Sequence, residues 1–235
     1  MRLQDFQLYS GELSAIEGDK VLINTLNAHS YNVSRNDALF TEALKNSDIL
    51  IPDGISVVWA IKWLNGKELK KIAGADLFFY EMKRLQKEAG SCFFLGSTEA
   101  TLAKIKERAA KEFPAIEVHT YSPPYKPEFS EEDSAAMVQA VNEVKPDVLF
   151  IGLSAPKQEK WAYKHFEQLK TGHVCCIGAV FDFYAGTITR APQWMINAGL
   201  EWLYRLVKEP KRMWRRYLVG NTKFLWAVGR EKLSG

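Results

Sequence analysis

The chain has 235 residues, of which 47% are hydrophobic and 25% are charged, and its net charge is +3. This composition is typical of a globular protein that buries a real core, and the length suits one large domain or one domain with an extension. No uncharged apolar run approaches the roughly 18–20 residues of a membrane-spanning helix, and the first residues lack a signal-peptide core, so any membrane contact is expected to be peripheral.

Short apolar runs alternate with helical patterns along most of the chain. The apolar runs predict buried strands at 21–24, 48–51, 91–95, 116–121, 147–152 and 173–177. Helical periodicity predicts helices at 37–46, 55–64, 76–88, 99–113, 131–144 and 157–169. This alternation indicates an α/β fold with a Rossmann-like, mainly parallel sheet that is flanked by helices and linked by right-handed crossovers.

In such sheets, ligands bind beyond the carboxyl ends of the strands. The segments that follow the predicted strands are therefore the places to look for a site, namely residues 25–29, 52–54, 96–98, 153–156 and 178–179.

The C-terminal segment differs in charge from the rest of the chain. Residues 190–235 contain ten Lys or Arg and three Asp or Glu, a net charge of +7, whereas residues 1–189 sum to −4. Four of the seven tryptophans also lie there, namely Trp194, Trp202, Trp214 and Trp226. Basic side chains interleaved with aromatic ones suit a surface that binds anionic headgroups or phosphates. We therefore expect an α/β core at 1–191 and a basic, Trp-rich helical appendage at 192–235.

The appendage contains two predicted helical stretches. The first covers 199–208, and the second begins at Pro210, because proline can start a helix but cannot continue one. On a helical wheel, one face of the second stretch gathers Met213, Trp214, Tyr217, Leu218, Phe224, Leu225 and Val228. Gly220 and Asn221 are candidates for interrupting this helix. The apolar face has two interpretations: it packs on the protein's own core, or it forms an interface, which the tryptophans and the positive charge favour.

Several common sites are absent from the sequence. No Gly-x-Gly-x-x-Gly follows a strand, and no P-loop or Asp-x-Asp motif occurs. The four histidines are scattered, and the three cysteines show no metal spacing, which indicates reduced thiols in a cytoplasmic protein. If the protein handles a diphosphate, side-chain cations therefore have to neutralise it without a metal.

Polar residues at the predicted strand ends are the candidates for chemistry. Asp53 lies between an apolar strand and a helix, where it is either a general base with a raised pKa or a turn residue that caps the helix. Thr25 and Asn27 are either strand-end hydrogen bonders or substrate ligands. Pro156-Lys157-Gln158-Glu159 opens a helix whose free N–H groups favour an anion, or is simply a helix start.

An ordered set of motifs extends through most of the sequence. It comprises Thr25-x-Asn27, Ile51-Pro52-Asp53-Gly54, Ala73-Gly74-Ala75-Asp76-Leu77, Pro156-Lys157-Gln158-Glu159, Phe181-Asp182-Phe183, Arg190-Ala191-Pro192, Gly199-Leu200-Glu201-Trp202, Arg205-Leu206 and Glu209-Pro210. In this set the chain resembles the WecG/TagA/CpsF glycosyltransferases (glycosyltransferase family 26) over nearly its full length.

The resemblance implies an inverting, metal-independent enzyme without a cofactor. Such enzymes take a UDP-sugar, typically UDP-N-acetylmannosamine, and extend an undecaprenyl-diphosphate-linked amino sugar on the inner face of the bacterial membrane. The family's catalytic aspartate falls on Asp53, its substrate-positioning residues on Thr25 and Asn27, and a further active-site ligand on Gln158. Its functional arginines match Arg205, Arg212 and Arg215, with Arg216 as a substitute for Arg215.

One position departs from the family pattern. Lys71 stands where many relatives have an arginine, and lysine keeps the charge but loses the bidentate fork. Lys71 is expected to bind substrate, although the role of this position in holding a diphosphate is open.

The resemblance also gives the appendage two tasks, which are to bind an anionic membrane and to complete the active site. A truncated chain without 192–235 is then expected to fold without turning over. The alternatives are a related transferase of glucose or glucuronic acid for exopolysaccharide, a non-enzymatic membrane-binding adaptor, and a nucleotide-dependent oxidoreductase. The donor sugar is expected to be N-acetylmannosamine or its uronic acid. No nucleic-acid partner is expected, and the exact donor, the polymer (teichoic acid or another polysaccharide) and homo-oligomerisation are left open.

Overall fold

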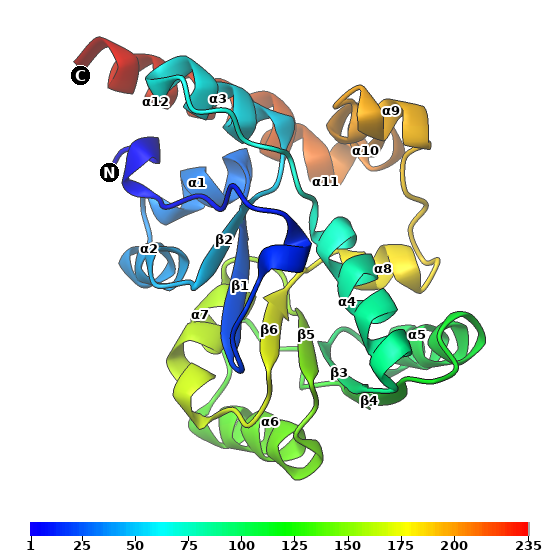
Figure 1. Ribbon diagram of the computed structural model, residues 1–235. Helices are drawn as coiled ribbons and strands as arrows, with labels where there is room; N and C mark the ends of the chain where they lie inside the picture. Colours follow the sequence, from blue (N-terminus) through cyan, green and yellow to red (C-terminus); the bar gives the residue numbers. More distant parts are fainter. Residues whose placement is uncertain (235) are drawn as a thin grey trace.

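The computed structural model describes residues 1–234, which form one six-stranded sheet with helices on both faces (Figure 1). All neighbouring strands pair in parallel, in the order β2-β1-β6-β5-β3-β4. The strands are β1 (Val21–Leu26), β2 (Ile49–Pro52), β3 (Ser91–Gly96), β4 (Glu117–Tyr121), β5 (Val148–Gly152) and β6 (His173–Cys176). The predicted α/β class is confirmed, and each predicted strand is present with its ends moved by at most a few residues.

The helices follow the predicted pattern with three short additions. The six predicted before the appendage are α2 (Ala38–Lys45), α3 (Ile55–Asn65), α4 (Gly74–Glu88), α5 (Glu99–Glu112), α6 (Glu131–Val144) and α7 (Lys157–His165). The sequence analysis missed α1 (Ala28–Ser34), α8 (Val180–Tyr184) and α9 (Gln193–Asn197). The C-terminal segment continues as α10 (Glu201–Lys208), α11 (Pro210–Trp214), a π-helical turn (Arg215–Val219) and α12 (Gly220–Ser234).

Three apolar clusters hold the layers together. Helices α4, α5 and α8 cover one face of the sheet, and α6 and α7 cover the other. A third cluster lies beyond the β2 edge and joins α1, α2 and α3 to α12, with Tyr31 and Phe224 in T-shaped contact at 5.4 Å between ring centroids. Helix α12 is therefore part of the folded core.

Part of the apolar stripe predicted for the C-terminal helix packs on the protein's own core, and part of it is exposed to solvent. Phe224 and Val228 are buried against the third cluster, whereas Leu218 and Leu225 are exposed. The two pairs lie on opposite sides of a wide stripe, at about 120–160° for the buried pair and about 220–240° for the exposed pair, so only one side of the stripe meets the core. Gly220 has helical angles (φ −65°, ψ −47°), so the helix is not interrupted there.

Polar contacts also fix α12 to the start of the chain. The buried Glu231 carboxylate accepts hydrogen bonds from the backbone N–H groups of Leu3 (2.6 Å) and Gln4 (3.1 Å). Asn32 donates to the Gly220 carbonyl at 2.7 Å. The first residues of the chain and α12 accordingly lie side by side in Figure 1. Truncation before α12 would leave the third cluster uncovered, so deletion of 192–235 tests folding as much as catalysis.

No helix among residues 1–234 combines the length and the apolar character needed to cross a bilayer. Cys92, Cys175 and Cys176 are free thiols inside the core.

Candidate active site

A cleft of about 1750 Å³ opens at the carboxyl ends of the strands, between the sheet and the C-terminal helices. Parallel pairing places the ends of β1 and β2 at the same edge, with Leu26 beside Pro52 in the register. The cleft brings together every residue singled out from the sequence, namely Thr25, Asn27, Asp53, Lys71, Gln158, Arg205, Arg212 and Arg215. Their roles stay predictions, but their proximity is a feature of the structure.

Asp53 lies in the turn between β2 and α3. Its backbone N–H donates to the Leu26 carbonyl at 2.9 Å, which ties the turn to the end of β1. The next residue, Gly54, has φ +127°, a conformation that L side chains rarely adopt, and it occupies the N-cap of α3 without a side-chain cap. Asp53 is therefore not the capping residue, and the helix-capping interpretation is wrong. No hydrogen bond among the described residues uses its carboxylate.

The surroundings of Asp53 prepare it for proton transfer. The pKa of Asp53 is raised from 3.8 to about 6, chiefly by burial and secondly by the nearby Glu201 carboxylate. The cations of Lys71 and Arg216 oppose this shift. A carboxylate with a pKa close to neutrality is ionised at pH 7 and still basic enough to receive a proton, which is what a general base requires.

Arginines from the C-terminal helices form the opposite wall of the cleft. Burial lowers the pKa of Arg216, the charges of Arg205 and Arg212 lower it further, and Asp53 acts in the opposite direction. The Nε atoms of Arg205 and Arg216 are buried and have no hydrogen-bond partner in the described part of the chain. Arg212 is paired with Glu209 at 3.0 Å. Because a buried guanidinium without partners is costly, this wall is arranged for an anionic ligand.

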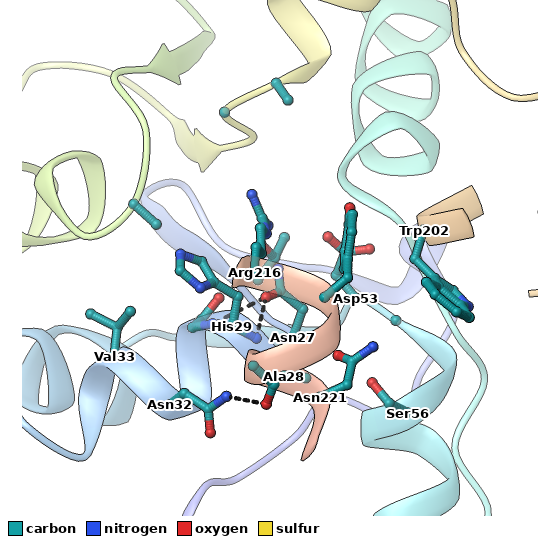
Figure 2. Close-up of a pocket in the computed structure, with 18 of the residues that line it drawn as sticks. Asn27, Ala28, His29, Asn32, Val33, Asp53, Ser56, Trp202, Arg216 and Asn221 are labelled. Carbon is teal, nitrogen blue, oxygen red and sulfur yellow. Dashed lines mark hydrogen bonds between the residues drawn. The ribbon is translucent and has the colours of Figure 1, made fainter. Parts of the chain in front are cut away.

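The structure distinguishes Arg216 from its neighbour Arg215. Figure 2 shows the Arg216 side chain between those of His29 and Asp53. Arg215 is exposed and lies over the Trp214 ring at 5.3 Å from its centroid. Both residues line the cleft, but only Arg216 lies close enough to Asp53 to affect its pKa. The π-helical turn begins at this pair. Arg216 follows the buried Met213 at the i,i+3 spacing that places two residues on one side of a helix, and Arg215 does not.

Thr25 and Asn27 come from the end of β1 and the start of α1. Thr25 is buried within the strand. The Asn27 side chain caps α1 by accepting from the backbone N–H groups of His29 and Ser30, both at 3.0 Å. This hydrogen bonding fixes the amide plane and leaves its Nδ2 donor without a partner among the described residues. Asn27 therefore combines a structural role with a donor that is available at the cleft.

Gln158 and Glu159 are buried at the start of α7. Gln158 Nε2 donates to Glu159 Oε1 at 2.9 Å, and Gln158 Oε1 and Glu159 Oε2 have no hydrogen-bond partner within residues 1–234. Burial raises the pKa of Glu159 to about 7. Its oxygens are shielded from solvent, so Glu159 is less suited than Asp53 to meet an acceptor hydroxyl. Sequence reasoning treated Glu159 as an ordinary first-turn residue, because nothing in the pattern shows that it is buried.

His29 is a second residue that sequence reasoning missed as a site component. It lines the cleft, and burial together with the adjacent Arg216 lowers its pKa to about 4. The imidazole is therefore neutral at pH 7 and a weaker base than Asp53.

Lys71 approaches Asp53 from the segment before α4 and makes no ion pair within residues 1–234. Across the same residues, no three His, Cys, Asp or Glu side chains gather as a metal-binding group. Lys71 and the arginine wall contribute positive charge to the cleft, which Arg35, Arg190 and Lys223 also line.

Comparison with known proteins assigns the chain to a family. Residues 8–235 match the glycosyl transferase WecG/TagA/CpsF family. The chain belongs to this family. It is 34% identical over 180 residues to an N-acetylglucosaminyldiphosphoundecaprenol N-acetyl-beta-D-mannosaminyltransferase of Bacillus spizizenii, covering 76% of this chain and 67% of that one. An enzyme with the same name from Bacillus subtilis is 29% identical over 197 residues, covering 84% of this chain and 75% of the relative.

The resemblance inferred from the motifs is thus confirmed, and the chain is a glycosyltransferase. Membership of the WecG/TagA/CpsF family argues against the adaptor and oxidoreductase alternatives. The cleft of this family member places Asp53, a carboxylate whose pKa is raised to about 6, near Arg216 on the wall formed by the C-terminal helices.

Proposed function

We propose that this WecG/TagA/CpsF protein transfers N-acetylmannosamine from its UDP conjugate to undecaprenyl-diphosphate-linked N-acetylglucosamine, with inversion at the anomeric carbon. The names of the two Bacillus relatives support the sugar and the acceptor. The observation that carries the mechanism is the placement of Asp53, with a pKa of about 6, opposite Arg205, Arg212 and Arg216.

The proposed step is a single displacement. The acceptor hydroxyl oxygen attacks the anomeric carbon while Asp53 takes the hydroxyl proton. The bond from the anomeric carbon to the β-phosphate oxygen breaks, and its electron pair leaves with UDP. Attack on the face opposite the leaving group inverts the configuration. The cleft can hold the two reactants together, which supplies much of the rate enhancement by orientation alone.

The leaving diphosphate gains negative charge as the bond breaks. Guanidinium groups that are already positioned stabilise that charge without having to reorganise. Arg205 and Arg216 offer unpartnered Nε donors for this purpose, and Lys71 adds a further cation near Asp53. We infer that these side chains do the work that a divalent metal does in other transferases, so that the enzyme is metal-independent.

The acceptor would be anchored in a bilayer, so the protein has to work at a membrane surface. The net charge of +7 over residues 190–235 supports peripheral attachment to anionic lipid on the cytoplasmic face, since each basic residue near such a surface contributes about 1 kcal/mol. The product would enter a cell-surface polysaccharide such as teichoic acid.

An assay of the purified protein tests this function directly. UDP-N-acetylmannosamine, UDP-glucose and UDP-glucuronic acid are each offered with a short-chain prenyl-diphosphate N-acetylglucosamine acceptor, with and without EDTA. We expect a β-linked disaccharide from the first donor at a rate that EDTA does not change. Preference for another donor would overturn the sugar assignment, and loss of product with EDTA would overturn the arginine-based mechanism.

The Asp53→Asn variant tests whether Asp53 is the general base. It is expected to bind UDP as the wild type does and to lose turnover. Retention of full turnover would assign proton removal to another group, with Glu159 as the next candidate.

A further inference from the structure

Helix α3 lies outside the basic appendage, and it presents two large aromatic side chains to solvent. Its inner side is buried in the third cluster through Val57, Ile61 and Leu64. Trp59 and Trp63 lie four residues apart on the outer side and are 65% and 56% exposed. Two tryptophans left side by side in water are unusual for a surface without a partner.

Helix α12 continues this surface. It packs against α3, as Figure 1 shows, although the two helices are far apart in the sequence. On its outer side Leu225 and Trp226 are 64% and 59% exposed. We call Trp59, Trp63, Leu225 and Trp226 the apolar face. All four of its residues also line the cleft that contains Asp53, so the face borders the mouth of the active site.

The charges around the apolar face are predominantly positive. Arg230 lies over the Trp226 ring at 4.8 Å from its centroid, and Lys223 and Lys232 are exposed on the same helix. Lys62 of α3 forms an ion pair with Glu68, which lies just beyond the helix, at 2.6 Å between Nζ and Oε1. Glu231 adds no exposed negative charge, because it is buried and accepts from the backbone of Leu3 and Gln4. Exposed cations beside tryptophans match the chemistry of an anionic lipid interface.

We propose that Trp59 and Trp63 of α3 form, together with Leu225 and Trp226 of α12, the surface by which this protein inserts into the headgroup region of an anionic bilayer. Half of the docking surface then belongs to residues 1–191 and not to the appendage. The indole rings enter the interface, the flanking lysines and arginines meet anionic headgroups, and the cleft mouth is held against the membrane. The inference rests on the proposed function in one respect, which is that a lipid-linked acceptor gives the cleft a reason to face the bilayer.

The double variant Trp59→Ser/Trp63→Ser tests the proposal. Cosedimentation is measured with vesicles of phosphatidylglycerol and phosphatidylcholine, and with phosphatidylcholine alone. We expect the variant to bind the anionic vesicles about tenfold or more weakly, because two aromatic side chains no longer enter the interface. Tyr125→Ser is the matched control. It removes a fully exposed aromatic residue beyond β4, at the other edge of the sheet, and is expected to leave vesicle binding unchanged.

Two acceptors separate docking from chemistry. Activity is compared on a vesicle-embedded acceptor and on a short-chain acceptor in solution, with circular dichroism and size exclusion to check folding and mass. The proposal predicts a loss that is about tenfold greater on the embedded acceptor.

Other results would overturn the proposal. Unchanged vesicle binding would do so, as would equal losses on both acceptors, which would make the tryptophans substrate ligands. A change in oligomer mass without a change in vesicle binding would make the face a contact between copies of this chain. If the wild type binds vesicles through these tryptophans but transfers no sugar to either acceptor, the proposed function fails while the docking surface stands.

Discussion

The C-terminal segment contains two regions that are continuous in sequence and different in physical role. The first, α10 through the π-helical turn, covers the cleft and supplies Glu201, Arg205, Arg212 and Arg216; we call it the cover. The second, α12, is an anchor that buries Phe224 and Val228 and binds the N-terminal backbone through Glu231. The cover holds buried polar groups without partners, whereas the anchor has its buried carboxylate fully hydrogen-bonded.

This difference indicates that the cover is suited to binding a ligand and the anchor to stabilising the fold. A buried cation without a ligand destabilises the free protein and becomes favourable only when an anion binds. A buried apolar side chain or a satisfied carboxylate stabilises the protein whether or not substrate is present. Changes in the cover and around Asp53 should therefore reduce activity while sparing or raising stability, and changes in the anchor should do the reverse.

The largest effect is expected from Asp53→Asn, opposite the cover. Loss of the general base should lower kcat by about 10²–10⁴-fold, measured with saturating donor and acceptor. The same change should stabilise the fold at pH 7. The pKa of Asp53 in the folded protein (about 6) lies above its ordinary value of 3.8. Asp53 therefore contributes to the free energy of unfolding fully below pH 3.8, and this contribution is lost as the pH rises through 6. Removing the charge should restore about 1–2 kcal/mol at pH 7 after allowance for solvent screening, measured by urea unfolding.

The next prediction separates the two adjacent arginines of the π-helical turn. Arg216→Ala should lower kcat/KM by about 10²–10³-fold, the usual effect of removing one group that stabilises transition-state charge. Its Tm should stay close to that of the wild type, because the buried guanidinium contributes little in the absence of ligand. Arg215→Ala, the matched variant, removes an exposed guanidinium that lies over Trp214 and should cost much less activity. A larger loss in Arg215→Ala would restore the assignment expected from the family pattern.

Phe224→Ala probes the anchor. Phe224 is fully buried against Tyr31, so its truncation leaves a cavity and should cost about 3–5 kcal/mol of unfolding free energy. Turnover per folded molecule should change little at a temperature where the variant is still folded. A fall in kcat comparable to that of Arg216→Ala, without loss of stability, would show that anchor and cover act as one unit.

The sequence predicted the elements that depend on strong local patterns. Apolar runs identified β1, β2, β3, β5 and β6, because buried strands contain few polar residues. β4 was also predicted, although it is an edge strand whose residues are exposed or half-buried. The candidate residues after β1 and β2 converge for the same reason, since parallel strand ends meet at one edge. α1 was missed because its residues Ala28–Ser34 lack helical periodicity and depend on the Asn27 cap.

Other features depended on contacts that a pattern does not contain. Which of Arg215 and Arg216 lies near Asp53, and which side of the C-terminal apolar stripe is buried, depend on how the C-terminal helices pack over the cleft. Glu159 is buried only because α7 packs on the sheet. Trp59 and Trp63 lie in a correctly predicted helix, but tryptophan is more often a core residue, and only the packing of α3 on α12 shows that both point outward.

The smallest effects are expected when one carboxylate in each region is replaced by an amide. Glu201 in the cover raises the pKa of Asp53, so Glu201→Gln should lower that pKa and move the acid limb of the kcat/KM profile below its wild-type midpoint near pH 6. Glu231→Gln in the anchor should leave the limb in place and lower the Tm, because the amide NH2 cannot accept from one of the two backbone N–H groups and the remaining acceptor oxygen is uncharged. If Glu201→Gln gave a profile that superimposed on the wild type, the midpoint would be set by burial alone. If the limb moved in Glu231→Gln, the anchor would have to act on the cleft through the fold, and the division between the two regions would fail.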